Sequence, residues 1–206
     1  MLWLAALISG LAGYLLGSVS FAIVVSRAFG LADPRSFGSG NPGATNVLRT
    51  GSKVAAALTL AGDALKGAVA VWLVGHLAPM VGLGEPASWL ALCAGLGAFV
   101  GHLYPIYFRF VGGKGVATFL GVIAAAEPMW GLIAGGVWVA MALAFRYSSL
   151  ASMSAALAVA VAQPLLGQPD RVSMILAGMA ALLIYRHRHN VQRLWTGTEA
   201  KLGKKI

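Results

Sequence analysis

The chain has 206 residues, of which 59% are hydrophobic and 10% are charged, and its formal net charge is +9. Soluble domains are about 45–50% apolar and about 25% charged, so this composition excludes a soluble globular protein. The low charge excludes a disordered chain, and the long apolar runs lack the alternation of a transmembrane β-barrel. In a membrane protein, positive charge is read first as a sign of which loops face the cytoplasm. We therefore expect no nucleic acid as a partner.

The apolar runs predict a bundle of membrane-spanning helices, because a spanning helix needs about 20 mainly apolar residues. In chain order, the predicted spans are residues 3–25, 54–75, 86–108, two within 115–145, 147–163 and 172–185. Glu127-Pro128 divides 115–145 into helices of about 15 residues, or roughly 23 Å each, against a hydrocarbon core of about 30 Å. Either the bilayer thins there, or one helix starts below the surface, or the region is re-entrant.

Basic residues set the predicted orientation. Most of the Lys and Arg residues fall in 27–53, in 109–114, at Arg146 and in the tail from Arg186. Loops rich in Lys and Arg stay on the cytoplasmic side. The sequence therefore predicts an all-α polytopic membrane protein, a single domain over residues 1–206. It predicts seven transmembrane helices, with the N-terminus outside and the C-terminus in the cytoplasm.

Small residues recur at close spacing in several predicted helices. Examples are Gly10, Gly13 and Gly17, and Gly95, Gly97 and Gly101. Small residues let helix backbones approach each other in lipid, so tight packing of the bundle is their expected role.

Asp63 and Lys66 stand three residues apart inside the second predicted span. Charged residues at membrane depth are costly, and they are usually paired or functional. A structural ion pair and a functional pair are both open interpretations.

The first of three polar blocks, residues 37–49, is richer in glycine than a connecting loop requires. Glycine allows backbone conformations in which successive N–H groups converge on an anion, and the guanidinium of Arg49 suits phosphate. Neutral donors come from Ser39, Asn41, Thr45 and Asn46. The block matches G-x-G-x-x-G, but that dinucleotide fingerprint needs a preceding strand, and a predicted membrane helix precedes it here. An ordinary turn between helices is the alternative.

The second block runs from Gly101-His102-Leu103-Tyr104-Pro105 to Gly112-Gly113-Lys114-Gly115-Val116-Ala117-Thr118. Gly-Gly-Lys-Gly combines permissive backbone with one cation, and it opens a predicted helix whose N-terminus favours anions. Phe108 and Gly115 stand where a Walker A loop needs Gly and Ser or Thr, so an ATP-type loop is not expected. His102 by itself is equally consistent with a hydrogen-bonded histidine near the interface.

The third block is Tyr185-Arg186-His187-Arg188-His189-Asn190. On a continuing helix, His187 and Asn190 would share one face. The alternative is a basic stop signal at the cytoplasmic end of the last span. No acidic residue or cysteine accompanies these histidines, so we expect no zinc site.

Together the three blocks supply glycine-rich backbone, neutral donors and scattered cations on the predicted cytoplasmic side. This chemistry suits a substrate that carries more than one phosphate charge. Metal-assisted phosphate chemistry relies on carboxylates, which are scarce here, so we expect neither a metal nor a cofactor.

At these three ordered blocks the sequence resembles the bacterial membrane glycerol-3-phosphate acyltransferases that use acyl phosphate as donor, and the resemblance covers essentially the whole chain. It implies a multi-pass protein of the bacterial cytoplasmic (inner) membrane whose active site faces the cytoplasm. The implied reaction moves a fatty acyl group from acyl phosphate to the sn-1 hydroxyl of glycerol 3-phosphate. The products would be lysophosphatidic acid and phosphate, in the first step of phospholipid synthesis, and membrane lipid would be a further partner.

The resemblance also implies the site residues. The donor phosphate would lie at Ser39, Asn41, Gly43, Thr45 and Asn46, and glycerol 3-phosphate would contact Ser39, Arg49, Lys114, His187 and Asn190. Gly40, Gly112, Gly113, Gly115 and Thr118 would complete the substrate-binding set, and Arg49, Lys114 and His187 would stabilise charge. The His-x-x-x-x-Asp motif of other acyltransferases is absent. The resemblance therefore implies that the donor's own phosphate oxygens accept the hydroxyl proton.

Two other classes of function stay open on the sequence alone. A transporter of a phosphorylated solute would also need cationic, glycine-rich loops, but it should show inverted repeats or polar residues near the midplane. A non-catalytic subunit of a membrane assembly would use the same loops as docking surfaces.

Overall fold

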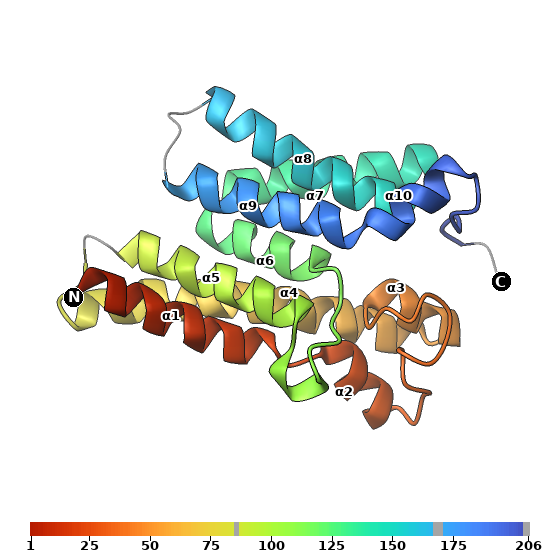
Figure 1. Cartoon of the computed structure of the whole chain (residues 1–206), viewed down its shortest axis with the longest axis horizontal. Coiled ribbons are helices and arrows are strands. Elements are labelled where there is room, and N and C mark those ends of the chain that lie inside the picture. The colour runs from red at the N-terminus through yellow and green to blue at the C-terminus, as the bar shows by residue number, and fades with distance from the viewer. Residues whose placement is uncertain (85–86, 167–170, 204–206) are drawn as a thin grey trace. The chain divides into compact units, whose positions relative to one another are not determined.

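The computed structural model describes residues 1–84, 87–166 and 171–203, and all regular structure within these ranges is helical (Figure 1). The predicted all-α class is therefore confirmed for the part of the chain that is described. The helices group into two compact units, Met1–Ala126 and Glu127–Ile206.

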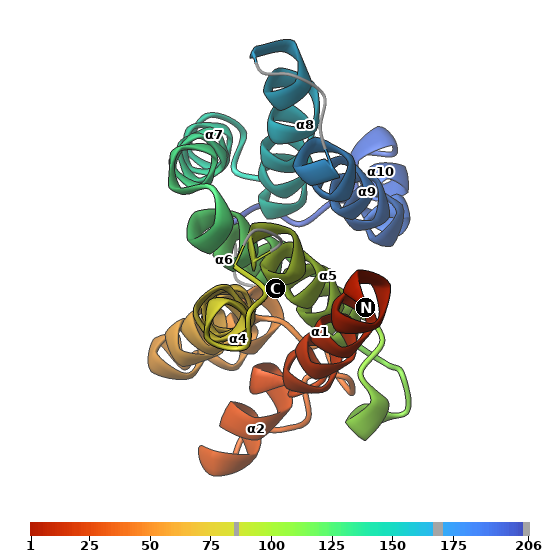
Figure 2. The same ribbon diagram turned by 90° about the vertical axis from the view of Figure 1, so that its left-hand side faces the viewer.

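The first unit is built around a long central helix, α4. Its helices are α1 (Leu2–Gly17), α2 (Phe21–Ala28), α3 (Ala44–Val47), α4 (Lys53–Met80), α5 (Ala87–Leu103) and α6 (Val116–Ala126), with 3-10 turns η1 (Leu48–Thr50) and η2 (Ile106–Phe108). Figure 2 shows α1 lying along α5 and α4 lying against α6. The α4 helix also packs on α5, so it joins the other long helices of the unit.

The second unit consists of α7 (Pro128–Phe145), α8 (Ser148–Leu166), α9 (Arg171–Arg186) and α10 (Arg188–Trp195). The α8 helix packs against both α7 and α9, and α10 follows α9 after a single intervening residue (Figure 2).

Five segments are long and apolar enough to cross a membrane: Leu2–Ala28, Lys53–Met80, Ala87–Phe108, Pro128–Phe145 and Ser148–Leu166. They correspond to five of the predicted spans, although residue 86, where the third was predicted to start, lies outside the described residues. The two remaining predictions fall on α6, with 11 residues, and α9, with 16 residues. Both are shorter than an ordinary spanning helix, so the count of seven crossings and the orientation stay predictions.

The predicted division of 115–145 is confirmed, because α6 ends at Ala126 and Pro128 begins α7. Proline is well tolerated at a first helical position, where its missing N–H is not needed. Before α6 the chain folds back along the end of α5: the Gly113 N–H donates to the His102 carbonyl at 3.1 Å, and Gly115 packs against Phe99. Gly115, the residue before α6, thus lies beside Phe99, about one helical turn before α5 ends at Leu103. A thinned bilayer, a helix that starts below the membrane surface and a re-entrant region all stay open as interpretations.

The first predicted span is not one continuous helix, so the expectation for 3–25 is wrong in this respect. The α1 helix ends at Gly17, and α2 begins only at Phe21. In the break, the Ser18 hydroxyl donates to the Tyr14 carbonyl, and the Val19 carbonyl accepts a hydrogen bond from Lys66 Nζ at 2.7 Å. The break therefore gives a buried ammonium group a backbone acceptor.

The close packing expected of the glycines is confirmed where α1 meets α5. A methyl group added at Gly13 or Gly17 would collide with the backbone carbonyls of Ala94 or Ala98. Reciprocally, one added at Gly97 would collide with the Gly10 carbonyl. The two backbones are in direct contact, which only glycine permits at these positions.

We predict that Gly13→Ala destabilises the protein, because overpacking a tight interface typically costs about 1–3 kcal/mol. Gly136→Ala in α7 is the matched control, since no atom lies within 4 Å of the added methyl group there. Thermal unfolding in detergent should show a lower Tm for Gly13→Ala and an unchanged or slightly higher Tm for Gly136→Ala. Equal melting temperatures would contradict the packing described.

Candidate functional site

One buried side chain, Asn46 of α3, organises the glycine-rich loop between α2 and α4. Its Nδ2 donates to the carbonyls of Pro34 at 2.6 Å and Phe37 at 3.2 Å, and its Oδ1 accepts from the Ser39 N–H at 3.1 Å. Three backbone groups of the loop are thus held by one amide. This amide shapes the loop, and its predicted contact with the donor phosphate stays a prediction.

Arg49 lies against the same loop. Gly38 and Gly40 hold φ angles of +60° and +64°, which side chains rarely adopt. A methyl group at Gly38 would come within 3.0 Å of Arg49 Cδ and Nη1, so the Arg49 side chain passes directly over the glycine. Ser39, the next residue, is exposed, as is Arg49 itself. A cation and a hydroxyl side chain therefore stand together at the loop surface.

Asn41 and Thr45, the two other polar residues of this loop that were predicted to bind substrate, lie around the turn into α3. Thr45 is exposed, and Asn41 is half-buried with its Nδ2 beside Gly43. The Gly43 carbonyl accepts the Asn46 N–H at 2.9 Å, which closes the first turn of α3.

The Gly-Gly-Lys-Gly loop is glycine-rich because it has no room for side chains. A methyl group at Gly112 would strike the His102 carbonyl, and one at Gly113 would strike the His102 imidazole. Gly115 has a φ of +86° and packs against the Phe99 ring. A methyl group added at Gly113 would also lie 3.0 Å from the Pro42 carbonyl oxygen. The first two polar blocks are therefore in contact. Lys114 follows directly, half-buried at this junction.

A buried polar network lies beneath this junction. Lys66 Nζ pairs with Asp63 Oδ1 at 2.8 Å, so the two residues form a buried ion pair. His102 Nδ1 lies 3.4 Å from the same oxygen, and the Thr118 hydroxyl donates to the Asp63 carbonyl at 2.8 Å. The network connects α4, α5 and α6, and through the His102 ring it reaches Gly113.

Thr118 was predicted to contact substrate. Its side chain is fully buried, and its hydroxyl proton is used in the contact between α6 and α4. The substrate contact of Thr118 stays a prediction, and the observed role is to hold the start of α6.

The third block belongs to the second unit, and the helix there does not continue through it. The α9 helix ends at Arg186, and His187 separates it from α10. The Asn190 N–H still donates to the His187 carbonyl at 2.7 Å, so the three-residue spacing survives as one turn. The buried His187 ring donates from Nδ1 to the Leu183 carbonyl at 2.8 Å. That bond places a proton on Nδ1, and any substrate contact of the ring falls to Nε2.

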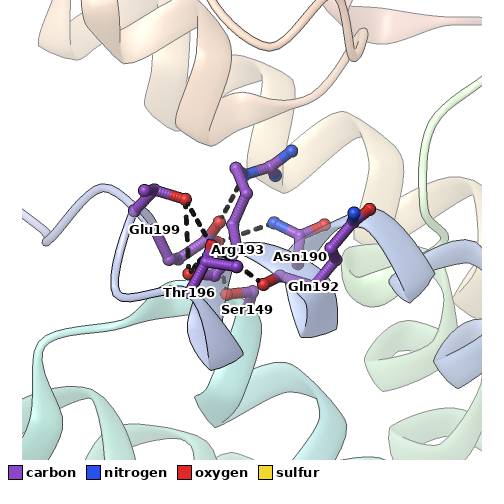
Figure 3. Close-up of polar contacts among 7 residues, drawn as sticks. Ser149, Asn190, Gln192, Arg193, Thr196 and Glu199 are labelled. Atoms are coloured by element: carbon purple, nitrogen blue, oxygen red, sulfur yellow. Dashed lines mark hydrogen bonds and ion pairs between the residues drawn. The ribbon is translucent and has the colours of Figure 1, made fainter.

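Sequence reasoning missed Glu199, which gathers several side chains of the second unit (Figure 3). Asn190 Nδ2 donates to Glu199 Oε1 at 2.6 Å, the Ser149 hydroxyl donates to the same oxygen, and Arg193 Nε pairs with Oε2 at 2.7 Å. A carboxylate from the tail therefore contacts the third block at Asn190, which was not predicted from the sequence. The signal was present in the sequence, because Glu199 is the one acidic residue in a strongly basic tail.

The environment of Glu199 favours its ionised form. Partial burial alone raises the pKa of this carboxyl, but the hydrogen bonds from Ser149, Asn190 and Arg193 outweigh it and hold the pKa below the usual 4.5. Among the described residues, no three His, Cys, Asp or Glu side chains lie close enough to hold a metal ion. The carboxylate is therefore an acceptor for its neighbours and orders the turn after α10.

Comparison with known proteins identifies close relatives. The family model for glycerol-3-phosphate acyltransferase matches residues 7–197. A glycerol-3-phosphate acyltransferase of Thiobacillus denitrificans is 57% identical over 195 residues, which cover 94% of this chain and 96% of the relative. Another, from Herminiimonas arsenicoxydans, is 51% identical over 202 residues, covering 98% and 97%.

The fold also matches solved structures. The crystal structure of PlsY (YgiH), an integral membrane glycerol 3-phosphate acyltransferase, in its glycerol 3-phosphate form is 40% identical with a TM-score of 0.85 and covers 96% of both chains. Its lysophosphatidic acid form is 39% identical with a TM-score of 0.83 and covers 96% of this chain and 95% of that one.

We predict that Glu199→Gln lowers stability at pH 7 by about 1 kcal/mol, because neutral partners replace charge-assisted hydrogen bonds. A carboxyl whose pKa is depressed by folding stabilises the native state above its unfolded pKa, and this contribution is lost as the pH falls through the native pKa. The stability difference between wild type and Glu199→Gln should therefore shrink in acid. Glu127→Gln is the control, since Glu127 makes no side-chain capping bond. Parallel pH profiles of Tm for the wild type and Glu199→Gln would contradict this role.

Proposed function

The chain belongs to the glycerol-3-phosphate acyltransferase family of integral membrane proteins, and from this we propose that it transfers a fatty acyl group from acyl phosphate to the sn-1 hydroxyl of glycerol 3-phosphate. The products are lysophosphatidic acid and inorganic phosphate. The two solved PlsY forms support this assignment, since one is named for the acceptor and the other for the acylated product.

The observation that carries the proposal is the contact between the two glycine-rich loops at Pro42 and Gly113. It brings Arg49 of one loop and Lys114 of the other to one region of the first unit. Asp33 and Asp63, the acidic residues described in this unit, are both engaged in ion pairs with Arg35 and Lys66. The two loops therefore combine cationic side chains with glycine-rich backbone, and this chemistry suits a ligand with several phosphate charges.

In the proposed reaction, the acceptor hydroxyl oxygen attacks the acyl carbonyl carbon, and the bond from that carbon to the phosphate oxygen breaks. The hydroxyl proton moves to a phosphate oxygen, and phosphate leaves, so no side chain acts as general base. Arg49, Lys114 and His187 stabilise the phosphate charges. Positioning two reactants can supply up to about 7–11 kcal/mol, and each preset donor about 3 kcal/mol more.

The remaining predicted site residues divide into two roles in this proposal. Ser39, Asn41 and Thr45 on the first loop and Asn190 on the third block bind phosphate or glycerol oxygens. A second group shapes the backbone around the phosphate; it comprises Gly40, Gly43, Asn46, Gly112, Gly113, Gly115 and Thr118. The contacts of Asn46 and Thr118 with the backbone favour this second role for both.

We further propose that both units serve one acyltransferase domain in the bacterial inner membrane, with seven crossings and the polar blocks facing the cytoplasm. The family match supports the single domain, because residues 7–197 extend through both units. The placement of Lys and Arg supports the orientation.

We predict that Arg49→Ala and Lys114→Ala each reduce acyl transfer by at least about 100-fold, since each removes a charged donor from the phosphate site. Lys53→Ala is the matched control, because Lys53 is exposed and begins α4 close to Arg49 in sequence. The assay follows labelled glycerol 3-phosphate into lipid-extractable product with purified protein. A wild-type rate in a folded Arg49→Ala or Lys114→Ala protein would remove that residue from the site.

We also predict that acyl phosphate supports turnover and acyl-CoA does not, because the reaction uses the donor's phosphate as proton acceptor. Purified enzyme with each donor separately gives the comparison. Robust turnover of acyl-CoA without any phosphate donor would overturn the mechanism. Accumulation of labelled glycerol 3-phosphate inside vesicles without lipid product would instead indicate a transporter.

A further inference from the structure

A second cationic site in the first unit lies outside the glycine-rich loops. A cavity of about 340 Å³ is lined by Arg27, Arg35, Tyr107, Phe108 and Arg109. Arg27 comes from the last turn of α2, Arg35 from the loop after it, and the other three residues from the turn that follows α5. None of them belongs to the proposed transfer site, so three arginines line a cavity that the proposed reaction does not use.

The charge in this cavity is only partly balanced. Asp33 is the acidic partner: its Oδ2 pairs with Arg35 Nη2 at 2.7 Å, and its Oδ1 accepts from Arg35 Nε at 3.0 Å. This pairing fixes the Arg35 fork, and a guanidinium with five N–H donors retains others for a ligand. Arg27 and Arg109 are exposed. Three arginines against one aspartate leave a site that suits a phosphate group, which arginine binds with matching geometry.

The backbone that carries Arg109 is held in an uncommon conformation. Arg109 and Phe110 have φ angles of 55° and 60°, which are rare for residues with side chains. The turn persists because the N–H groups of Phe108 and Phe110 both donate to the Pro105 carbonyl. Strained backbone tends to persist where it serves a function. Here it places one arginine on the wall of the cavity.

Large apolar side chains lie exposed beside the arginines. They are Phe29, Ile106, Tyr107, Phe110 and Val111. Aromatic residues next to arginine are typical of the headgroup layer of a membrane, where one side of the protein surface is apolar and the other is charged. Arg27 is also the first charged residue after an apolar segment long enough to span the bilayer.

We propose that this cavity binds the phosphodiester headgroup of an anionic phospholipid from the surrounding bilayer. The lipid phosphate lies among the three guanidinium groups, and the acyl chains lie along the exposed apolar side chains. The site stands independently of the acyl-transfer reaction. It also adjoins the glycine-rich loop, because the Pro34 carbonyl beside Arg35 accepts the hydrogen bond from Asn46.

The test is a lipid-binding measurement on the full chain in detergent, by native mass spectrometry, with phosphatidylglycerol and phosphatidylcholine titrated separately. Wild type should bind one phosphatidylglycerol at least tenfold more tightly than phosphatidylcholine. The double variant Arg27→Gln/Arg109→Gln should lose that tenfold preference. Arg146→Gln/Arg188→Gln removes the same charge from exposed sites in the second unit, and it should bind within twofold of wild type.

Acyl transfer that persists in Arg27→Gln/Arg109→Gln would show that the variant is folded. If the double variant fails to fold, the single exposed change Arg27→Gln should still weaken phosphatidylglycerol binding severalfold. An equal loss in the Arg146→Gln/Arg188→Gln control would show attraction to overall charge and overturn the site. Displacement of the bound lipid by inorganic phosphate at matching concentration would assign the cavity to a free anion and overturn the lipid proposal.

Discussion

The interaction on which the first unit depends is the buried contact of Asp63, Lys66 and His102. A carboxylate and an ammonium group inside apolar helices are tolerated only when each meets its partners, because an uncompensated charge there is very costly. Lys66 satisfies this requirement with Asp63 and with the carbonyl that the break between α1 and α2 exposes. One charge pair thereby contacts the break where one helix stops, and through His102 it reaches the loop that carries Lys114.

The two glycine-rich loops meet different physical requirements. In the first, glycine provides positive φ angles at Gly38 and Gly40, and the Asn46 amide holds the resulting turn. In the second, glycine at 112 and 113 provides space, because the end of α5 fills the volume where side chains would lie. Both loops end as rigid backbone against a buried polar group. In the proposed reaction, backbone held in this way positions the phosphate-binding residues without the cost of first ordering a flexible chain.

Local patterns predicted much of this structure from the sequence. Pro128 divided the fourth apolar run, the glycines of α1 and α5 indicated close packing, and the spacing of Asp63 and Lys66 indicated a pair. Contacts between distant residues could not be predicted in this way. In the break after Gly17 a backbone carbonyl meets Lys66, 47 residues away, and Glu199 is held by Ser149, 50 residues away. His187 interrupts its helix although no proline or glycine marks the position.

The start of α6, one helical turn before the end of α5, affects how the fatty acyl chain and the water-soluble glycerol 3-phosphate meet in the proposed reaction. A fatty chain drawn out of the bilayer loses about 0.8 kcal/mol for each methylene group exposed to water. In the proposed topology, a polar loop set back by one helical turn, about 5 Å, holds glycerol 3-phosphate closer to the hydrocarbon. The acyl carbonyl group of the donor then moves a shorter distance out of the hydrocarbon. Several methylene groups of the fatty chain stay out of water during the proposed transfer.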